Sequence, residues 1–257
     1  TSPCLILGVF EKRQLTAATQ LIDTASQGYL TRILGKGDLD GEAGRTLLLH
    51  EVPALAAERV LLVNLGPQDK YDRKTFGKAI TATLSRLNET NVPEALCALP
   101  ASPPQELDLY LAVRDTVTKA LDQDYHYEIT KSEKKPPNPL QRLQLWISDP
   151  EESSLAKQAL RHGLAMARGV ALAKELGNLP GNICTPTYLA DEAEALAKDF
   201  PALKVTILEE ADMAKIGMGA LLSVSRGSRQ PAKLITMHYR GGKKDEKPVV
   251  LVGKGLT

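Results

Sequence analysis

Residues Glu58–Leu65 read ERVLLVNL, a run of apolar and β-branched side chains that Gly66-Pro67 closes. A short apolar run bounded by turn residues predicts a strand. Cys4–Phe10 (CLILGVF) has the same character and predicts a second, buried strand. These runs indicate that the first part of the chain is built on a hydrophobic sheet.

Helical patterns alternate with such strands along the first half of the chain. In Leu15–Ser26, apolar side chains recur at the spacing of one helix face, and Gly28 provides a stop signal. Alternating strands and helices predict an α/β sandwich whose sheet is largely parallel. The other helices expected are Asp72–Leu87 and Leu107–Leu121, and the other strands are Tyr29–Leu34, Arg45–Val52, Ala95–Leu99, Tyr125–Thr130 and Leu143–Ile147.

The stretch Glu151–Leu176 has no glycine-proline break and no strand-like run. It predicts a helix of about 26 residues, or about 39 Å at the usual rise. Asp149-Pro150 suits its start, because aspartate can cap a helix and proline is tolerated in the first turn. We therefore expect an N-terminal α/β domain over residues 1–150, a connecting helix over 151–177, and the opening of a second α/β domain over 178–257.

The second domain is expected to start with a helix at Thr185-Pro186. Pro248–Val252 (PVVLV) is wholly apolar, as a central strand buried on both faces would be. Open α/β sheets bind ligands at the carboxyl ends of their strands, so Gly253–Thr257 would lie in a favoured place for chemistry. Between these ends we expect the strands Leu203–Leu208 and Lys233–Tyr239 and the short helices Glu210–Ile216 and Gly219–Ser225.

The bulk composition narrows the class of protein. The chain has 257 residues and a net charge of +1, which argues against a strongly basic nucleic-acid protein. It has no apolar run of about 18 residues and no secretory signal, so no membrane span is expected. Three scattered cysteines form no disulfide or zinc pattern, and Cys4 and Cys97 are expected to be buried, inert thiols. We therefore expect a cytoplasmic protein.

Lys254 is the first candidate for chemistry, because it follows an apolar strand and stands between two glycines. From spacing alone, a lysine on a glycine turn is the simpler interpretation. Neither the phosphate-binding GxxxxGK[ST] pattern nor the dinucleotide pattern GxGxxG is present. The histidines are isolated and form no zinc motif, so we expect structural roles for His50, His126, His162 and His238.

Three segments resemble the leucyl aminopeptidase (cytosol aminopeptidase) family. Lys174–Asn182 (KELGNLPGN) with Cys184–Ala190 (CTPTYLA) resembles the family's asparagine-proline signature followed by TPxxLA. Gly217–Ser228 (GMGALLSVSRGS) resembles the segment GMGALLAVxxGS. Val249–Thr257 (VVLVGKGLT) is similar to the opening of the metal-site motif VGKGxTFDxGG.

The resemblance implies a metallo-aminopeptidase that removes N-terminal residues, leucine among them, from peptides in intracellular turnover. It implies two divalent ions, zinc or manganese, and a homo-hexamer. The residue matching Lys254 is then a metal ligand, neutral when it coordinates. Two metals can bind the peptide's amino terminus, polarise the scissile carbonyl and activate a bridging water.

The metal-site motif is cut after Thr257, so the other ligands of the family are expected beyond this point. One lysine does not make a metal site. We therefore expect a truncated catalytic domain, inactive as a 257-residue piece, in which the general base and the substrate pocket cannot be assigned.

Two other classes of function are open on the sequence alone. Some bacterial relatives bind DNA in transcription or recombination, and Lys131–Leu140 (KSEKKPPNPL) is a basic, proline-rich loop. The net charge gives DNA binding little support. The remaining alternative is a stand-alone α/β binding module, in which Lys254 only ends a strand.

Overall fold

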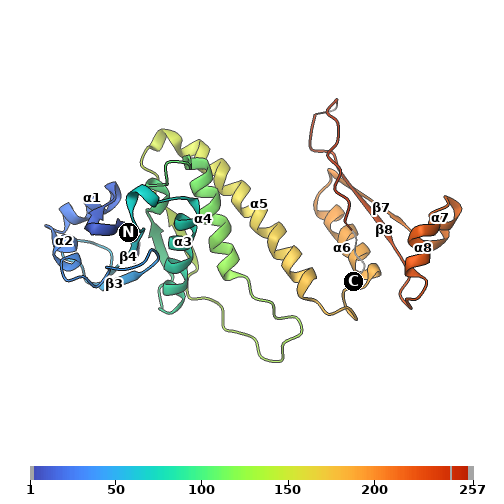
Figure 1. The fold of residues 1–257 in the computed structure, drawn as a ribbon, viewed down its shortest axis with the longest axis horizontal. Coiled ribbons are helices and arrows are strands. Elements are labelled where there is room, and N and C mark those ends of the chain that lie inside the picture. The colour runs from blue at the N-terminus through green and yellow to red at the C-terminus, as the bar shows by residue number, and fades with distance from the viewer. Residues whose placement is uncertain (1–2, 244, 254–257) are drawn as a thin grey trace. The chain divides into compact units, whose positions relative to one another are not determined.

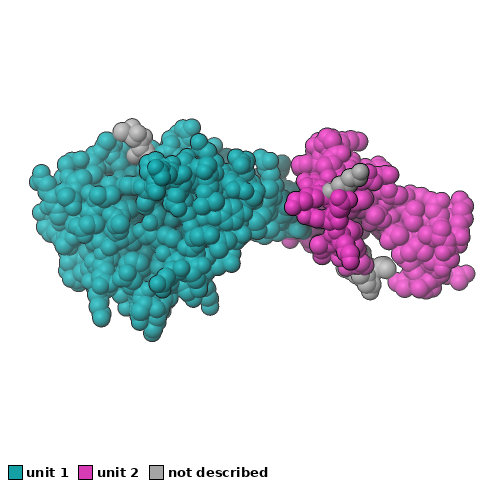
Figure 2. All heavy atoms as spheres, turned by 90° about the horizontal axis from the view of Figure 1, so that it is seen from above, with its two compact units in different colours: residues 1–175 teal, residues 176–257 magenta. Residues whose placement is uncertain are grey.

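The computed structural model describes residues 3–243 and 245–253, and its chain divides into two compact units. Unit 1 spans Thr1–Glu175 and unit 2 spans Leu176–Thr257 (Figures 1 and 2). The sequence-based division, with a connecting helix over residues 151–177, stays a prediction.

Unit 1 is built on a six-stranded sheet with the order β3-β4-β1-β5-β6. The pairs β1–β4, β1–β5 and β5–β6 are parallel, whereas β3 runs antiparallel to β4 at one edge and the short β2 pairs with the end of β1. The sheet is therefore largely parallel, as expected. Its strands are β1 (Cys4–Phe10), β2 (Gln14–Leu15), β3 (Thr46–His50), β4 (Arg59–Asn64), β5 (Glu94–Cys97) and β6 (Arg142–Leu145).

Side chains of β1 alternate between two hydrophobic clusters, one on each face of the sheet. Cys4 and Ile6 belong to one cluster, and Leu7 and Val9 belong to the other. Successive side chains of a strand point to opposite faces, so both faces of this strand are covered. This confirms the buried strand predicted for Cys4–Phe10.

Helices cover both faces of the sheet (Figure 1). Helices α1 and α2 contribute Ala18, Leu30 and Leu34 to one cluster, and α3 and α4 contribute Phe76 and Ala112 to the other. Polar caps begin three of these helices: a side-chain oxygen of Thr16, Asp72 or Asp108 accepts a backbone N–H three residues later. The helices are α1 (Ala17–Ala25), α2 (Tyr29–Leu34), α3 (Arg73–Asn88) and α4 (Leu109–Asp124).

The long helix α5 (Ser153–Asn178) is present, preceded by a short 3-10 turn at Pro150–Glu152. A side-chain oxygen of Asp149 accepts the Glu151 N–H at 2.9 Å, which is the capping role expected for that aspartate. Within unit 1, Ala159 of α5 packs on Val113 and Val117 of α4. Small side chains on α5 allow this close approach.

Two strand predictions in unit 1 are wrong. Tyr29–Leu34 forms helix α2, and its Leu30 and Leu34, one helical turn apart, are both buried. Tyr125–Thr130 forms no strand, because the Tyr125 N–H donates back to Leu121 at the end of α4 and Ile129 is exposed. The following Lys131–Leu140 is a loop, as expected.

In unit 2, the short helix-capping and turn signals of the sequence are confirmed. The Thr185 hydroxyl accepts the Tyr188 N–H at 3.2 Å and starts α6, with Pro186 in the first turn. Strands β7 and β8 form an antiparallel pair from Leu203↔Tyr239 to Leu208↔Leu234. The elements are α6 (Pro186–Asp199), β7 (Leu203–Leu208), α7 (Glu210–Lys215), α8 (Gly219–Ser225) and β8 (Leu234–Tyr239).

The central strand predicted at Pro248–Val252 is not formed in this structure. Leu251 and Val252 are 92% and 94% exposed, and no strand in the described part of the chain pairs with this segment. A strand needs a neighbour to satisfy its backbone hydrogen bonds, and an apolar run alone does not supply one. Across the described residues, no helix is both long and apolar enough to cross a membrane.

Candidate functional site

The residue predicted to carry chemistry, Lys254, lies outside the described residues. The segment that leads to it is described as far as Gly253, which is exposed. The predicted role of Lys254 therefore stays a prediction.

The other metal-ligand types do not gather into a site. Among residues 3–243 and 245–253, no group of three or more His, Cys, Asp or Glu side chains could hold a metal ion. His162 makes a structural contact, since its Nδ1 lies 2.6 Å from the hydroxyl oxygen of Tyr110. That contact joins α5 to α4 within unit 1.

Two of the three thiols are buried in strands of unit 1, as expected. Burial raises the pKa of the Cys4 thiol to about 11 and that of the Cys97 thiol to about 12. Such thiols stay protonated near neutral pH and react slowly. Cys184 is only partly buried.

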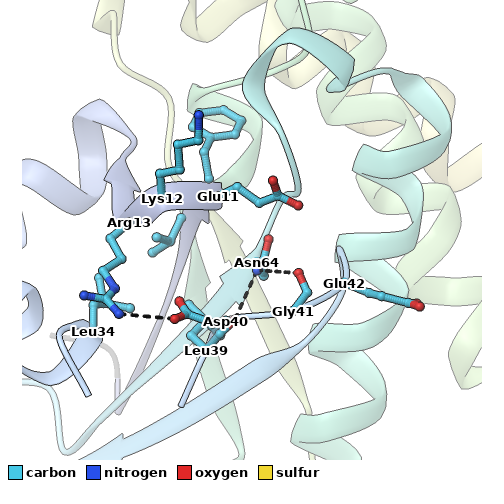
Figure 3. Close-up of a pocket in the computed structure, with 11 residues that line it drawn as sticks. Glu11, Lys12, Arg13, Leu34, Leu39, Asp40, Gly41, Glu42 and Asn64 are labelled. Atoms are coloured by element: carbon cyan, nitrogen blue, oxygen red, sulfur yellow. Dashed lines mark hydrogen bonds and ion pairs between the residues drawn. The ribbon is translucent and has the colours of Figure 1, made fainter. Parts of the chain in front are cut away.

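A cavity of about 690 Å³ lies in unit 1 at the carboxyl ends of β1 and β4. Figure 3 shows it between the turn that follows β1 and the segment that precedes β3. The sequence analysis did not find this cavity. Its lining residues are Val9, Phe10, Glu11, Lys12, Arg13, Leu34, Leu39, Asp40, Gly41, Glu42 and Asn64.

Asn64 holds one wall of the cavity in place. This residue ends β4, is 4% exposed, and donates its side-chain amide to the carbonyl oxygens of Leu39 at 3.0 Å and Gly41 at 3.1 Å (Figure 3). Its Oδ1 accepts the Gly66 N–H at 2.7 Å. One polar residue in the apolar run ERVLLVNL was the only signal for this site in the sequence.

The turn after β1 forms the opposite wall and has an unusual backbone. Lys12 and Arg13 have φ of 55° and 63°, in the left-handed region that favours glycine or asparagine. The Gln14 N–H donates to the Glu11 carbonyl and closes the turn. The Arg13 guanidinium then pairs with Asp40 across the cavity at 3.2 Å (Figure 3).

Comparison with known proteins decides the family. The N-terminal domain of the cytosol aminopeptidase family matches residues 6–134, and the catalytic domain of that family matches residues 171–257. The chain belongs to the cytosol aminopeptidase family. Among its curated relatives, the "Probable cytosol aminopeptidase" of Nitrosococcus oceani is 48% identical over 255 residues, and that of Dechloromonas aromatica is 46% identical over 257 residues.

The match covers 98% of this chain and 51% of the Nitrosococcus protein, and 100% and 51% for the Dechloromonas protein. The chain therefore spans about half the length of the curated family members it matches. A solved mutant of tomato leucine aminopeptidase has the same fold, with a TM-score of 0.74 at 21% identity over 95% of this chain and 49% of that one. The bottromycin maturation enzyme BotP, in complex with Mn, gives a TM-score of 0.67 at 22% identity over 92% and 45%.

Proposed function

We propose that the protein to which this chain belongs is a metal-dependent aminopeptidase that releases N-terminal residues, leucine among them, from peptides. The observation that carries the proposal is the match of residues 171–257 to the catalytic domain of the family. The relatives named as cytosol aminopeptidases, at 46–48% identity, support it. Their names do not support the DNA-binding alternative.

We propose divalent metal as the cofactor, two ions of zinc or manganese, with Lys254 as one ligand. The manganese in the BotP structure supports a divalent ion in this fold. The described residues do not fit such a site by themselves, because they hold no cluster of metal-ligating side chains. The proposal therefore requires further ligands outside the described residues. When bound, the ions would polarise the scissile carbonyl and activate water.

A cytoplasmic location and a homo-hexamer belong to the same proposal and rest on the family resemblance alone. We also propose that residues 1–257, expressed alone, do not hydrolyse peptides.

The role of Lys254 is tested by the Lys254→Ala variant of the whole protein. We expect at least about a hundredfold loss of activity on leucine p-nitroanilide, together with a lower metal content by elemental analysis. Lys247→Ala, a lysine seven residues earlier, is the matched control and should keep both. Full metal content and full activity in the Lys254→Ala variant would remove Lys254 from the site.

A further inference from the structure

The cavity of unit 1 has the position and size of a small-molecule site. Parallel α/β sheets bind ligands outside the carboxyl ends of their strands, where this cavity lies. Its volume of about 690 Å³ falls within the usual range for such sites. Nothing in the proposed peptidase activity assigns it a role.

The inner part of the cavity is apolar and rigid. Val9, Leu34 and Leu39 are at most 3% exposed overall, and all three belong to the hydrophobic cluster on that face of the sheet. Asn64 fixes the segment that carries Leu39. A branched aliphatic group could therefore pack there without loss of order in the walls.

The rim offers one free charge of each sign. Arg13 and Asp40 neutralise each other, and Glu42 lies 3.7 Å from Lys78. Within the part of the chain that the structure describes, the Glu11 carboxylate and the Lys12 ammonium have no hydrogen-bond or ion-pair partner. These two side chains come from adjacent residues of one turn (Figure 3).

From this arrangement we propose that the cavity binds a small zwitterion with an apolar side chain, either a free α-amino acid or a short peptide. Glu11 pairs with the ligand's ammonium group, and Lys12 pairs with its carboxylate. Val9, Leu34 and Leu39 contact the aliphatic side chain.

The backbone of the turn supports a functional role. Two adjacent left-handed positions carry long cationic side chains where glycine would fit without strain. Strained residues of this kind concentrate at binding sites, where the side chain has a task that glycine cannot perform.

A nucleotide fits the rim less well, although this position in parallel sheets often binds one. The residues after β1 are Glu11-Lys12-Arg13, and no glycine-rich phosphate loop follows the strand. Glu11, Asp40 and Glu42 would place three carboxylates near the phosphates.

The test is isothermal titration calorimetry on the 257-residue chain in EDTA, so that no metal site contributes. Leucine should bind. Its decarboxylated analogue 3-methylbutylamine, its deaminated analogue 4-methylpentanoate and glycine should each bind about three- to tenfold more weakly. If leucine does not bind at millimolar concentration, or if AMP binds in its place, the proposal is overturned.

Charge-removing variants assign the two ends of the ligand. Glu11→Gln should weaken leucine about three- to tenfold and leave 4-methylpentanoate unchanged, whereas Lys12→Gln should weaken leucine and leave 3-methylbutylamine unchanged. The exposed Glu58→Gln, before β4 at the other end of the sheet, and Lys119→Gln on α4 are the controls. Thermal unfolding shows that each variant folds.

Unchanged leucine affinity in both rim variants would refute the assignment. Because no metal is present, failure of this proposal would leave the peptidase proposal untouched.

Discussion

The side-chain amide of Asn64 donates a hydrogen bond of 3.0 Å to the backbone carbonyl of Leu39, twenty-five residues earlier in the chain. The bond ties the end of the central strand β4 to a segment without regular structure. That segment forms a wall of the cavity in unit 1. One polar side chain at a strand end thus shapes the cavity.

Replacing this side chain should destabilise unit 1. In Asn64→Ala, the Gly66 N–H and the carbonyl groups of Leu39 and Gly41 lose their partner. We expect the free energy of unfolding to fall by about 2–4 kcal/mol, measured by urea denaturation. Asn91→Ala, at an exposed asparagine in a turn, should change it by less than about 0.5 kcal/mol. Equal effects of the two variants would show that the side chain of Asn64 does not hold the wall.

The contact between α4 and α5 makes a second prediction. A Cβ on Gly163 would lie 2.9 Å from the Val117 Cβ and 3.0 Å from the Arg114 carbonyl oxygen, so Gly163→Ala must push the helices apart. We expect a loss of about 1–3 kcal/mol in the free energy of unfolding.

Gly169 lies in the same helix, and a Cβ there would meet nothing within 4 Å. Gly169→Ala should therefore stabilise the chain by about 0.5–1 kcal/mol, because alanine loses less backbone entropy on folding. The two midpoints should move in opposite directions in the same urea titration. A shift of both in one direction would mean that the packing of α5 on α4 differs from that described.

The turn after β1 should gain stability when its strain is relieved. Lys12→Gly removes a side chain from a left-handed position, with φ of 55°. We expect the free energy of unfolding to rise by up to about 1 kcal/mol, partly offset by the greater entropy of glycine in the unfolded chain. Gln27→Gly, at φ of 56° and away from the cavity, should give a similar gain but leave leucine binding intact. Destabilisation by both variants would exclude strain at these positions.

Thiol reactivity should separate the three cysteines. In the folded chain at pH 8, Cys184 should react with Ellman's reagent, whereas Cys4 and Cys97 should react only after denaturation. Fast labelling of all three thiols in the native state would show that the strands of unit 1 open readily. Labelled peptides identified by mass spectrometry give the readout.

The same thiols predict how stability depends on alkaline pH. Their folded pKa values, about 11 and about 12, lie above the unfolded value of 9.0, so the unfolded chain loses these protons first. Their contribution to stability is complete below pH 9 and is lost as the pH rises toward 12. A double variant, Cys4→Ala with Cys97→Ala, should therefore show a shallower fall in urea midpoint between those limits.

The sheet and the long helices could be predicted because their signal is local. β1, β4, α3 and α5 are each long or apolar enough for periodicity to identify them. Tyr29–Leu34 is only six residues long and rich in residues that favour strands. Its helix depends on Asp23, which accepts the backbone N–H of Thr31 at 3.0 Å and its hydroxyl at 2.6 Å.

The cavity could not be predicted, for the same reason. It forms where the Asn64 amide meets the Leu39 and Gly41 carbonyls, and where Arg13 meets Asp40. Those contacts join residues more than twenty positions apart, and no local pattern encodes them. Lys254 was found only through the motif of the family, and its surroundings lie outside the described residues.

The most direct test of the proposed activity is hydrolysis of leucine p-nitroanilide by the intact protein, before and after its metal is removed with EDTA and then restored with Mn²⁺ or Zn²⁺. Intact mass confirms the species assayed, expected at about twice the 27.8 kDa of this chain because the chain spans 51% of its relatives. We predict hydrolysis that EDTA abolishes and metal restores. Hydrolysis that persists without metal, or none at any metal content, would contradict a metal-dependent aminopeptidase.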